Sequence, residues 1–255
     1  MIKVFKNEND LAYNLSLEIL YQIKKNKKRY ILGCPGGRSL KKTYYYLGRL
    51  SSKLNISLDK LVLVMMDEYV LIKNNKFKLV DSKEHYSCVR FSRNVIKKLL
   101  NYKKNKTNSL KNQNILFPEI SNPKNYDHFI KKIGGIDLFL LASGSTDGHV
   151  AFNNKYCKLN QKTHITKLSV ETRKDNIKTF SKFKKLSEVP KFGVTVGLGT
   201  ITSLSKKSIL VLAGKEKNEA FKKIKYLKKF DKSWPSSVIF NCKKYKIYVD
   251  QLASS

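Results

Sequence analysis

Short apolar runs alternate with longer segments of helical periodicity along almost the whole chain. The run at 61–66 is continuously apolar and the run at 136–142 is nearly so, as expected for strands that are buried on both faces of a sheet. Residues 11–23 instead place their apolar side chains close to the spacing of an amphipathic helix. The pattern predicts further strands at 2–5, 30–34, 193–196, 208–213, 237–240 and 247–249, and further helices at 39–50, 89–101, 125–133 and 217–227.

This alternation predicts an α/β fold with a Rossmann-like, mostly parallel sheet flanked by helices. The 255 residues contain no fixed-period repeat and no Pro/Gly/Ser-rich linker, so we expect a single domain over residues 1–255. In such sheets, ligands bind beyond the carboxyl ends of the strands, where loops meet helix N-termini. Three segments are predicted to be loops in that position, at 35–39, 67–70 and 143–154, and they hold the residues best suited to chemistry.

The first of these loops, within G-C-P-G-G-R-S at 33–39, joins a predicted strand to a predicted helix. Gly36 and Gly37 let backbone N–H groups approach an anion, Ser39 adds a hydroxyl that can cap the helix, and the helix N-terminus is electropositive. The loop matches neither the dinucleotide-binding motif nor the P-loop. A tight turn that needs glycine for its backbone angles explains the same residues equally well. On its own the loop leaves phosphate binding and a plain turn open.

The second segment places two consecutive carboxylates, Asp67 and Glu68, at the end of an apolar run. Consecutive side chains point in opposite directions there, so at most one carboxylate faces a cleft while the other is paired or solvated. A carboxylate that leaves so apolar a strand is expected to be partly desolvated, which raises its pKa toward that of a useful proton acceptor. The alternative is an acidic surface turn. With only 19 acidic residues in the chain, the consecutive pair favours a functional role.

The third segment places Asp147 two residues before His149. An acid at this distance can orient the imidazole ring and fix its tautomer, as in catalytic triads. Gly144 and Gly148 would let a substrate approach the backbone closely. The alternative is a hydrogen-bonded loop histidine without a catalytic role, and this is how we interpret the other three histidines of the chain.

Composition and charge mainly exclude certain classes of partner and site. The formal net charge is +33, but only six of the 52 basic residues are arginines, whose guanidinium binds phosphates and bases through a bidentate fork. The lysines are spread along the chain, so we expect solvated basic surfaces and no specific nucleic-acid partner.

The apolar runs are too short to span a membrane. The four cysteines lack metal-site spacing, which predicts thiols in a reducing cytoplasm and no metal site.

Several motifs resemble those of the glucosamine-6-phosphate deaminase/isomerase family, whose fold is shared with 6-phosphogluconolactonases. They are M-D-E-Y-V at 66–70, D-G-H-V-A-F-N at 147–153 and V-P-K-F-G-V-T-V-G-L-G-T at 189–200, with a looser match for L-A-G-K-E-K at 212–217. The resemblance covers nearly the whole chain. A lactonase would be expected to show D-E-R at 67–69 and D-G-H-T-A-S at 147–152, so the deaminase branch fits better.

The resemblance implies an aldose–ketose isomerisation of an amino-hexose 6-phosphate, such as glucosamine 6-phosphate, to fructose 6-phosphate with loss of ammonia. It implies that His149 opens the pyranose ring while Asp147 holds the imidazole, and that Asp67 moves a proton from C2 to C1. The substrate phosphate would bind Gly36, Gly37, Ser39 and Lys217. The expected partner is a small sugar phosphate, and this acid–base chemistry requires no metal and no organic cofactor. The family forms both monomers and hexamers, so a homo-oligomer stays open.

Three positions depart from the family pattern. Where the family has a glutamate after the A-F-N motif, in its catalytic acid–His–acid arrangement, this chain has Asn154, which accepts a hydrogen bond but cannot shuttle a proton. Where the family has a phosphate-binding arginine, a colinear alignment places Lys178, a point charge without a bidentate fork. The glycine loop is one residue shorter than in the deaminases and carries Arg38, which could supply the missing guanidinium.

These departures leave two alternatives beside a deaminase of altered specificity. One is a hydrolase closer to the lactonases, in which His149 would activate water. The other is a catalytically silent sugar-phosphate-binding protein, suggested by Asn154 and Lys178.

Overall fold

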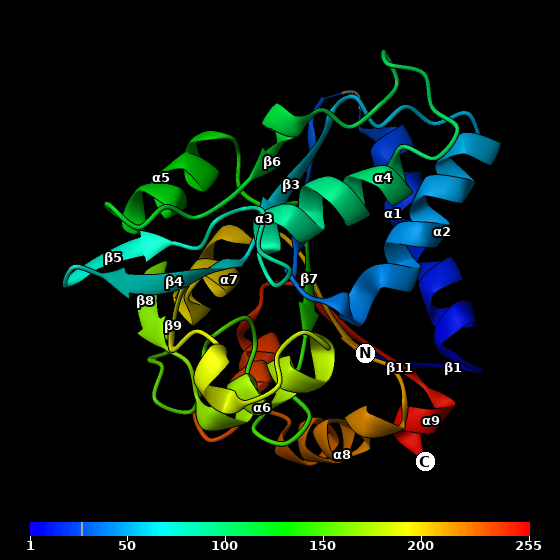
Figure 1. Cartoon of the computed structure of the whole chain (residues 1–255). Coiled ribbons are helices and arrows are strands. Elements are labelled where there is room, and N and C mark those ends of the chain that lie inside the picture. Colours follow the sequence, from blue (N-terminus) through cyan, green and yellow to red (C-terminus); the bar gives the residue numbers. More distant parts are fainter. Residues whose placement is uncertain (27) are drawn as a thin grey trace.

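The computed structural model describes residues 1–26 and 28–255, which form an α/β structure with two sheets (Figure 1). Each strand of the larger, seven-stranded sheet is parallel to its neighbours. In spatial order its strands are β1 (Ile2–Phe5), β11 (Tyr245–Asp250), β10 (Ser208–Leu212), β7 (Leu138–Ala142), β2 (Tyr30–Cys34), β3 (Leu61–Met65) and β6 (Ile115–Leu116). The predicted fold class is therefore confirmed.

Helices cover both faces of this sheet. In chain order the α-helices are α1 (Glu8–Lys25), α2 (Lys41–Lys53), α3 (Cys88–Phe91), α4 (Lys97–Leu100), α5 (Lys124–Lys132), α6 (Val170–Thr179), α7 (Leu198–Leu204), α8 (Asn218–Leu227) and α9 (Gln251–Ser254). A π-helical turn at Ser92–Ile96 joins α3 to α4, so that residues 88–100 form one continuous helix. Short 3-10 helices lie at Arg38–Leu40, Asn112–Asn114, Leu186–Glu188, Lys215–Lys217 and Pro235–Asn241.

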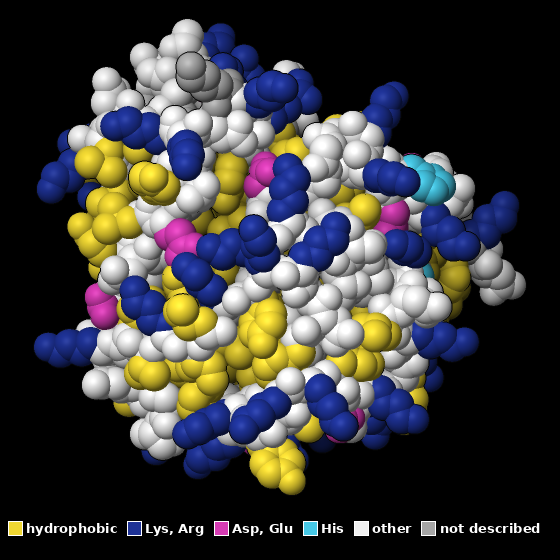
Figure 2. Space-filling view, turned by 180° about the vertical axis from the view of Figure 1, so that it is seen from behind, with side chains coloured by type: hydrophobic (Ala, Val, Ile, Leu, Met, Phe, Trp, Pro, Cys, Tyr) yellow, Lys and Arg dark blue, Asp and Glu magenta, His cyan; other side chains and the backbone are white. Residues whose placement is uncertain are grey.

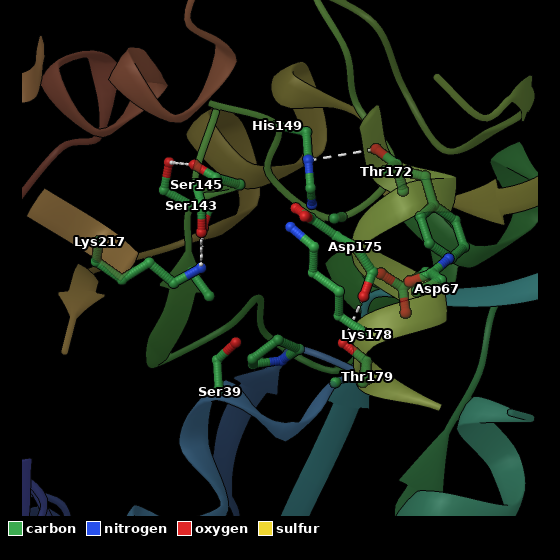
Figure 3. A pocket seen from close by; sticks show the side chains of 18 of the residues that line it. Ser39, Asp67, Ser143, Ser145, His149, Thr172, Asp175, Lys178, Thr179 and Lys217 are labelled. Atoms are coloured by element: carbon green, nitrogen blue, oxygen red, sulfur yellow. Dashed lines mark hydrogen bonds between the residues drawn. The ribbon is translucent and has the colours of Figure 1, made fainter. Parts of the chain in front are cut away.

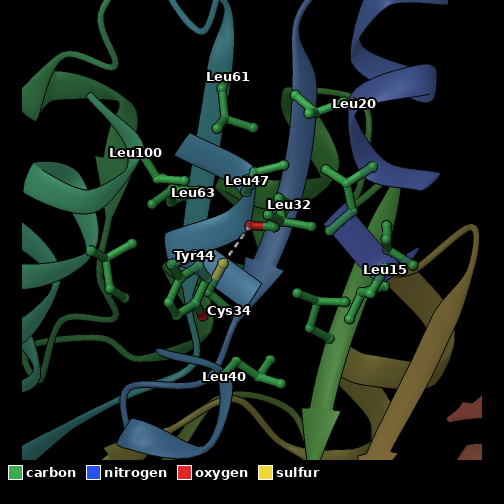
Figure 4. Packing of buried hydrophobic residues seen from close by; sticks show 14 of the residues in the cluster. Leu15, Leu20, Leu32, Cys34, Leu40, Tyr44, Leu47, Leu61, Leu63 and Leu100 are labelled. Carbon is green, nitrogen blue, oxygen red and sulfur yellow. Dashed lines mark hydrogen bonds between the residues drawn. The ribbon is translucent and has the colours of Figure 1, made fainter. Parts of the chain in front are cut away.

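The central strands are buried on both faces, as their continuous apolar sequences predict. Successive side chains of a strand point to opposite faces. On β2, Leu32 therefore packs in one apolar cluster and Ile31 in another. The cluster around Leu32 contains side chains of α1, α2 and α4, among them Leu15, Tyr44 and Leu100 (Figure 4). The cluster on the opposite face contains side chains of α5, α7 and α8.

The smaller sheet is antiparallel and lies at one side of the molecule (Figure 1). Its order is β5 (Lys76–Leu79), β4 (Asp67–Lys73), β9 (Phe192–Thr195) and β8 (His164–Lys167). The prediction of a loop at 67–70 is therefore wrong, because after a single intervening residue the chain leaves β3 and enters β4. The hairpin turns at Asn74 and Asn75, both with positive φ, as a two-residue type I′ turn requires.

Two further predictions are wrong. Residues 237–240 belong to a 3-10 helix and not to a strand; Val238 and Ile239 are fully buried there, and periodicity alone cannot separate a short buried helix from a buried strand. Ser39 does not cap a helix, since α2 begins at Lys41 and its N-cap Leu40 makes no side-chain capping bond.

Basic side chains are distributed over the surface. Figure 2 shows lysines and arginines spread across the reverse face, with acidic and apolar side chains between them. No helix in the described ranges is both long enough and apolar enough to cross a membrane.

Candidate active site

A cavity of about 680 Å³ lies at the carboxyl ends of four adjacent strands of the parallel sheet, β10, β7, β2 and β3. Each of these strands is followed by a segment that lines the cavity, and the segments include Lys217, His149, Ser39 and Asp67. Helix α6 adds Thr172 and four other residues from the opposite side (Figure 3). The cavity thus lies where open α/β sheets bind their ligands, and it brings together residues from all three segments singled out in the sequence.

His149 lines one wall of the cavity and is held by Asp147, which does not itself line the cavity. Asp147 Oδ1 lies 2.7 Å from His149 Nδ1 and 3.2 Å from the His149 backbone nitrogen, which donates to it. Because a carboxylate can only accept a hydrogen bond, His149 Nδ1 carries the proton. His149 Nε2 is then the ring nitrogen that can exchange a proton with a ligand. Burial alone would raise the pKa of Asp147, but hydrogen bonds from His149 and Ser169 outweigh it and hold the pKa below its ordinary value.

Two hydroxyls at the start of α6 stabilise this pair, and the sequence analysis did not identify either of them as part of the site. Ser169 caps α6 by accepting from the Thr172 backbone nitrogen, and its hydroxyl lies 3.1 Å from Asp147 Oδ2 as a donor. Thr172 Oγ1 lies 3.3 Å from His149 Nδ1. A serine just before a helix, as at Ser169, is a recognisable N-cap, but nothing local shows that the cap reaches a carboxylate 22 residues away.

Gly144 lines the cavity, yet the space beside its Cα is taken by protein. A Cβ at this position would collide with Asp147 Oδ1 and His149 Nδ1. The missing side chain of Gly144 therefore makes room for Asp147 and His149, and the expectation that a substrate approaches the Gly144 backbone stays a prediction.

Asp67 is the first residue of β4, is 6% exposed and lines the same cavity. Burial raises its pKa to about 7, with Glu68 adding to the rise, while a hydrogen bond from Cys88 and the proximity of His149 oppose it. The expectation of a desolvated carboxylate with a raised pKa is confirmed. A group with this pKa can accept and return a proton near neutral pH.

Glu68 points away from the cavity and is held by four donors. Its Oε1 accepts from the backbone nitrogens of Tyr69 at 2.7 Å and Cys88 at 3.0 Å, and its Oε2 from Ser87 Oγ and the Val89 nitrogen, both at 2.8 Å. The alternative of an acidic surface turn is therefore wrong. Only Asp67 of the two carboxylates faces the cavity, as strand geometry predicts.

The other end of the cavity is rich in groups that can bind an anion. Gly36, Gly37 and Ser39 line it, and Lys217 Nζ is fixed there by donating to Ser143 O at 2.9 Å and Ser145 Oγ at 3.1 Å. Burial lowers the pKa of Lys217. Lys178 extends into the cavity from α6, opposite Lys217 (Figure 3).

Two predicted site residues whose side chains the structure describes, Asp147 and Asn154, do not line the cavity. Asn154 is nearly buried outside the cavity: it accepts from the Tyr156 nitrogen at 3.0 Å and donates to Lys167 O at 3.3 Å, which braces the chain between the two sheets. The side chain of Arg38 lies outside the described part of the structure.

The cavity also contains residues that the sequence analysis missed, namely Glu8, Cys88, Thr172, Asp175 and Glu216. They come from elements scattered along the chain and belong to no local motif. Within residues 1–26 and 28–255, no group of three or more His, Cys, Asp or Glu side chains is arranged to hold a metal ion.

Known structures place the fold in a class that contains both sugar-phosphate deaminases and lactonases. The chain superposes with a TM-score of 0.83 and 23% identity on a monomeric glucosamine-6-phosphate deaminase described as a missing link of the NagB superfamily, covering 99% of this chain and 98% of that one. It superposes with a TM-score of 0.68 and 14% identity on the 6-phosphogluconolactonase of Leishmania guyanensis, covering 100% and 97% of the two chains.

Sequence relatives narrow the class. The chain is 31% identical over 255 residues to the glucosamine-6-phosphate deaminase of Mycoplasma mycoides subsp. mycoides, covering 99% of this chain and 95% of the relative. It is 29% identical over 252 residues to the glucosamine-6-phosphate isomerase of Candida albicans, covering 98% and 96%. No family model matches the sequence. The chain belongs to the glucosamine-6-phosphate deaminase/isomerase family of enzymes.

Proposed function

We propose that this protein converts glucosamine 6-phosphate to fructose 6-phosphate and ammonia within the cavity at the carboxyl ends of β10, β7, β2 and β3. The observation that carries the proposal is that Asp67, whose pKa burial raises to about 7, lines one cavity with Lys217 and with His149, whose ring Asp147 orients. A base, an oriented imidazole and a fixed cation are the groups that this reaction requires.

His149 opens the sugar ring. Its Nδ1 is engaged by Asp147, so Nε2 accepts the proton of the C1 hydroxyl and passes a proton to the ring oxygen as the C1–O5 bond breaks. Asp147 stabilises the imidazolium formed in between, as the acid of a triad does. Ser169 and Thr172 hold the pair from α6.

Asp67 moves the proton that interconverts aldose and ketose. It takes the proton from C2, the electron pair of that bond forms a C1–C2 double bond, and the C1=O bond opens to a hydroxyl that takes its proton from the substrate ammonium. The proton on Asp67 then returns to C1 as the amine lone pair forms the C2=N bond. The resulting iminium at C2 takes up water and releases ammonia, so water supplies the ketone oxygen of fructose 6-phosphate. A carboxyl with a pKa near the working pH can both accept and return this proton.

The phosphate binds at the opposite end of the cavity. Lys217, Lys178, Ser39 and the backbone of Gly36 and Gly37 form its site, with Lys217 held in place before the ligand arrives. A lysine provides charge without the two-point fork of an arginine, so Lys178 favours a weaker orientation of the phosphate. A phosphate contact from Arg38 and a catalytic role of Asn154 stay predictions.

The test is turnover of glucosamine 6-phosphate, followed through both fructose 6-phosphate and ammonia. We expect both products in equal amounts, and their loss in His149→Ala. His128→Ala is the matched control, because His128 lies exposed on α5 and the substitution should leave turnover unchanged.

Other outcomes would contradict the proposal in distinguishable ways. Hydrolysis of 6-phosphogluconolactone that survives Asp67→Asn, without ammonia release, would favour the hydrolase. Binding of a hexose phosphate without turnover of either substrate would favour the silent binding protein.

A further inference from the structure

Cys88, at the start of α3, lies directly against the candidate base. Its Sγ is 3.3 Å from Asp67 Oδ1, and its backbone nitrogen donates to Glu68 Oε1 at 3.0 Å. The side chain is 4% exposed and lines the same cavity as His149 and Lys217. One residue from a distant helix thus contacts both carboxylates at the start of β4.

The direction of the thiol–carboxylate hydrogen bond follows from the chemistry of its two partners. Burial and the nearby Glu68 and Asp67 carboxylates raise the pKa of Cys88 well above its ordinary value, so the sulfur keeps its proton. An ionised carboxylate can only accept. The thiol therefore donates to Asp67, and this bond favours the charged carboxylate over the neutral acid.

The same contact distinguishes the two oxygens of Asp67. A Cβ on Gly36 would lie 2.5 Å from Asp67 Oδ1 and 2.7 Å from Cys88 Sγ, so the glycine loop packs directly on this pair of atoms. Oδ1 is enclosed between the thiol and the backbone of Gly36. Oδ2 accepts no hydrogen bond from the described residues and is the oxygen left to exchange a proton.

Other charged and titratable groups surround Asp67 without donating a hydrogen bond to its carboxylate. Glu68 opposes its ionisation and His149 favours it. Burial raises the pKa values of Tyr44 of α2, Tyr69 of β4 and Tyr126 of α5, and the Asp67 charge adds to each rise, so these side chains stay neutral phenols. Within the described residues, Cys88 is the only hydrogen-bond donor to the Asp67 side chain.

We infer that Cys88 is a positioning residue for Asp67: its thiol holds Oδ1 and favours the carboxylate, so that Oδ2 is ionised and correctly placed to take the substrate's proton near neutral pH. This inference rests on the proposed role of Asp67. Burial and Glu68 raise the pKa of Asp67, and once the thiol is removed His149 is the neighbour that still lowers it. The Asp67 carboxylate then forms at higher pH, and the acid limb of the activity profile moves with it.

The experiment compares Cys88→Ala, Cys88→Ser and the unchanged protein by kcat/KM against pH with glucosamine 6-phosphate. We expect the acid limb of Cys88→Ala to move up by about 0.5–1 pH unit, with a loss of roughly 3- to 10-fold below the midpoint and a smaller loss above it. Cys88→Ser keeps a donor, so its midpoint should return toward that of the unchanged protein. Cys242→Ala is the matched control, since Cys242 is an equally buried thiol whose Sγ bonds to Val238 O away from the cavity.

A second readout separates this inference from the proposed function. Infrared difference spectra across the Asp67 titration, assigned with Asp67→Asn, should show the S–H stretch of Cys88 shifting as the carboxylate forms. This measurement uses the intact protein and does not depend on turnover or on the stability of Cys88→Ala. An S–H band that ignores the Asp67 titration, or an acid limb that stays in place in a folded Cys88→Ala, would overturn the inference. Absence of turnover in the unchanged protein, with a responsive S–H band, would contradict only the proposed substrate.

Discussion

The first two residues of β4, Asp67 and Glu68, both carry a carboxyl group, but these two groups lie in different environments on opposite faces of the strand. Asp67 faces the cavity with one thiol as its donor, whereas Glu68 faces α3 with four donors. Burial raises the pKa of both, but the hydrogen bonds from Val89, Tyr69, Cys88 and Ser87 oppose the rise at Glu68. A carboxylate that is fully bonded stabilises the structure, and one that is left under-bonded is available for proton transfer.

The largest effect that this comparison predicts is on turnover. Asp67→Asn removes the base and should lower kcat by about 10²- to 10⁴-fold, while the fold is retained because the amide matches the carboxyl in size. The measurement is kcat on glucosamine 6-phosphate, with circular dichroism as the check on folding. Unchanged turnover in this variant would remove Asp67 from the mechanism.

A second effect appears in the pH dependence of stability. The pKa of Asp67 rises from 3.8 to about 7 on folding, so between these values the folded protein holds a proton that the unfolded chain has lost. The stability that this group contributes is present below about pH 4 and is lost as pH rises through about 7. Asp67→Asn should therefore gain stability relative to the unchanged protein as pH rises, by no more than about 4 kcal/mol.

Denaturant unfolding at several pH values between 4 and 8 measures that difference. A constant difference across this range would mean that Asp67 has an ordinary pKa in the folded protein.

The third effect concerns the contact between the glycine loop and Asp67. Gly36→Ala places a Cβ within 2.7 Å of Asp67 Oδ1 and Cys88 Sγ, whereas Gly37 has nothing within 4 Å of the corresponding position. We expect Gly36→Ala to lower kcat/KM by roughly 10- to 100-fold, because displacement of a catalytic group by a fraction of an ångström misaligns it. Gly37→Ala should stay within about threefold, and equal losses in both would point to the loop conformation instead.

The smallest effect belongs to the fully bonded carboxylate. Glu68→Gln puts an amide NH₂ where the structure has only donors, which should cost about 1–3 kcal/mol of folding free energy. Its kcat should fall by less than that of Asp67→Asn. Thermal unfolding and kcat measured on the same preparation check both, and a stable but inactive Glu68→Gln would reverse the roles assigned to the two residues.

The sequence predicted the parallel sheet better than the antiparallel one, for a physical reason. Strands such as β3 are buried on both faces and read as continuous apolar runs, whereas β5 is exposed along its length and reads as K-F-K-L. The signal for its hairpin was the Asn74–Asn75 pair, whose positive φ angles fit a two-residue turn.

In the site, contacts between residues close in sequence could be predicted, whereas contacts between distant residues could not. Asp147 and His149 are two residues apart, so their pairing could be predicted from spacing. Cys88 instead reaches Asp67 from 21 residues away, and Ser169 reaches Asp147 from 22 residues away. Only the packing of α3 and α6 brings them there.

The most direct test of the account follows the proton that Asp67 is proposed to move. Glucosamine 6-phosphate carrying deuterium at C2 should react more slowly than the unlabelled sugar, and part of the deuterium should appear at C1 of fructose 6-phosphate. Asp67→Asn should lose both the turnover and the transfer. Turnover by Asp67→Asn at the rate of the unchanged protein, with the label still reaching C1, would contradict the central claim.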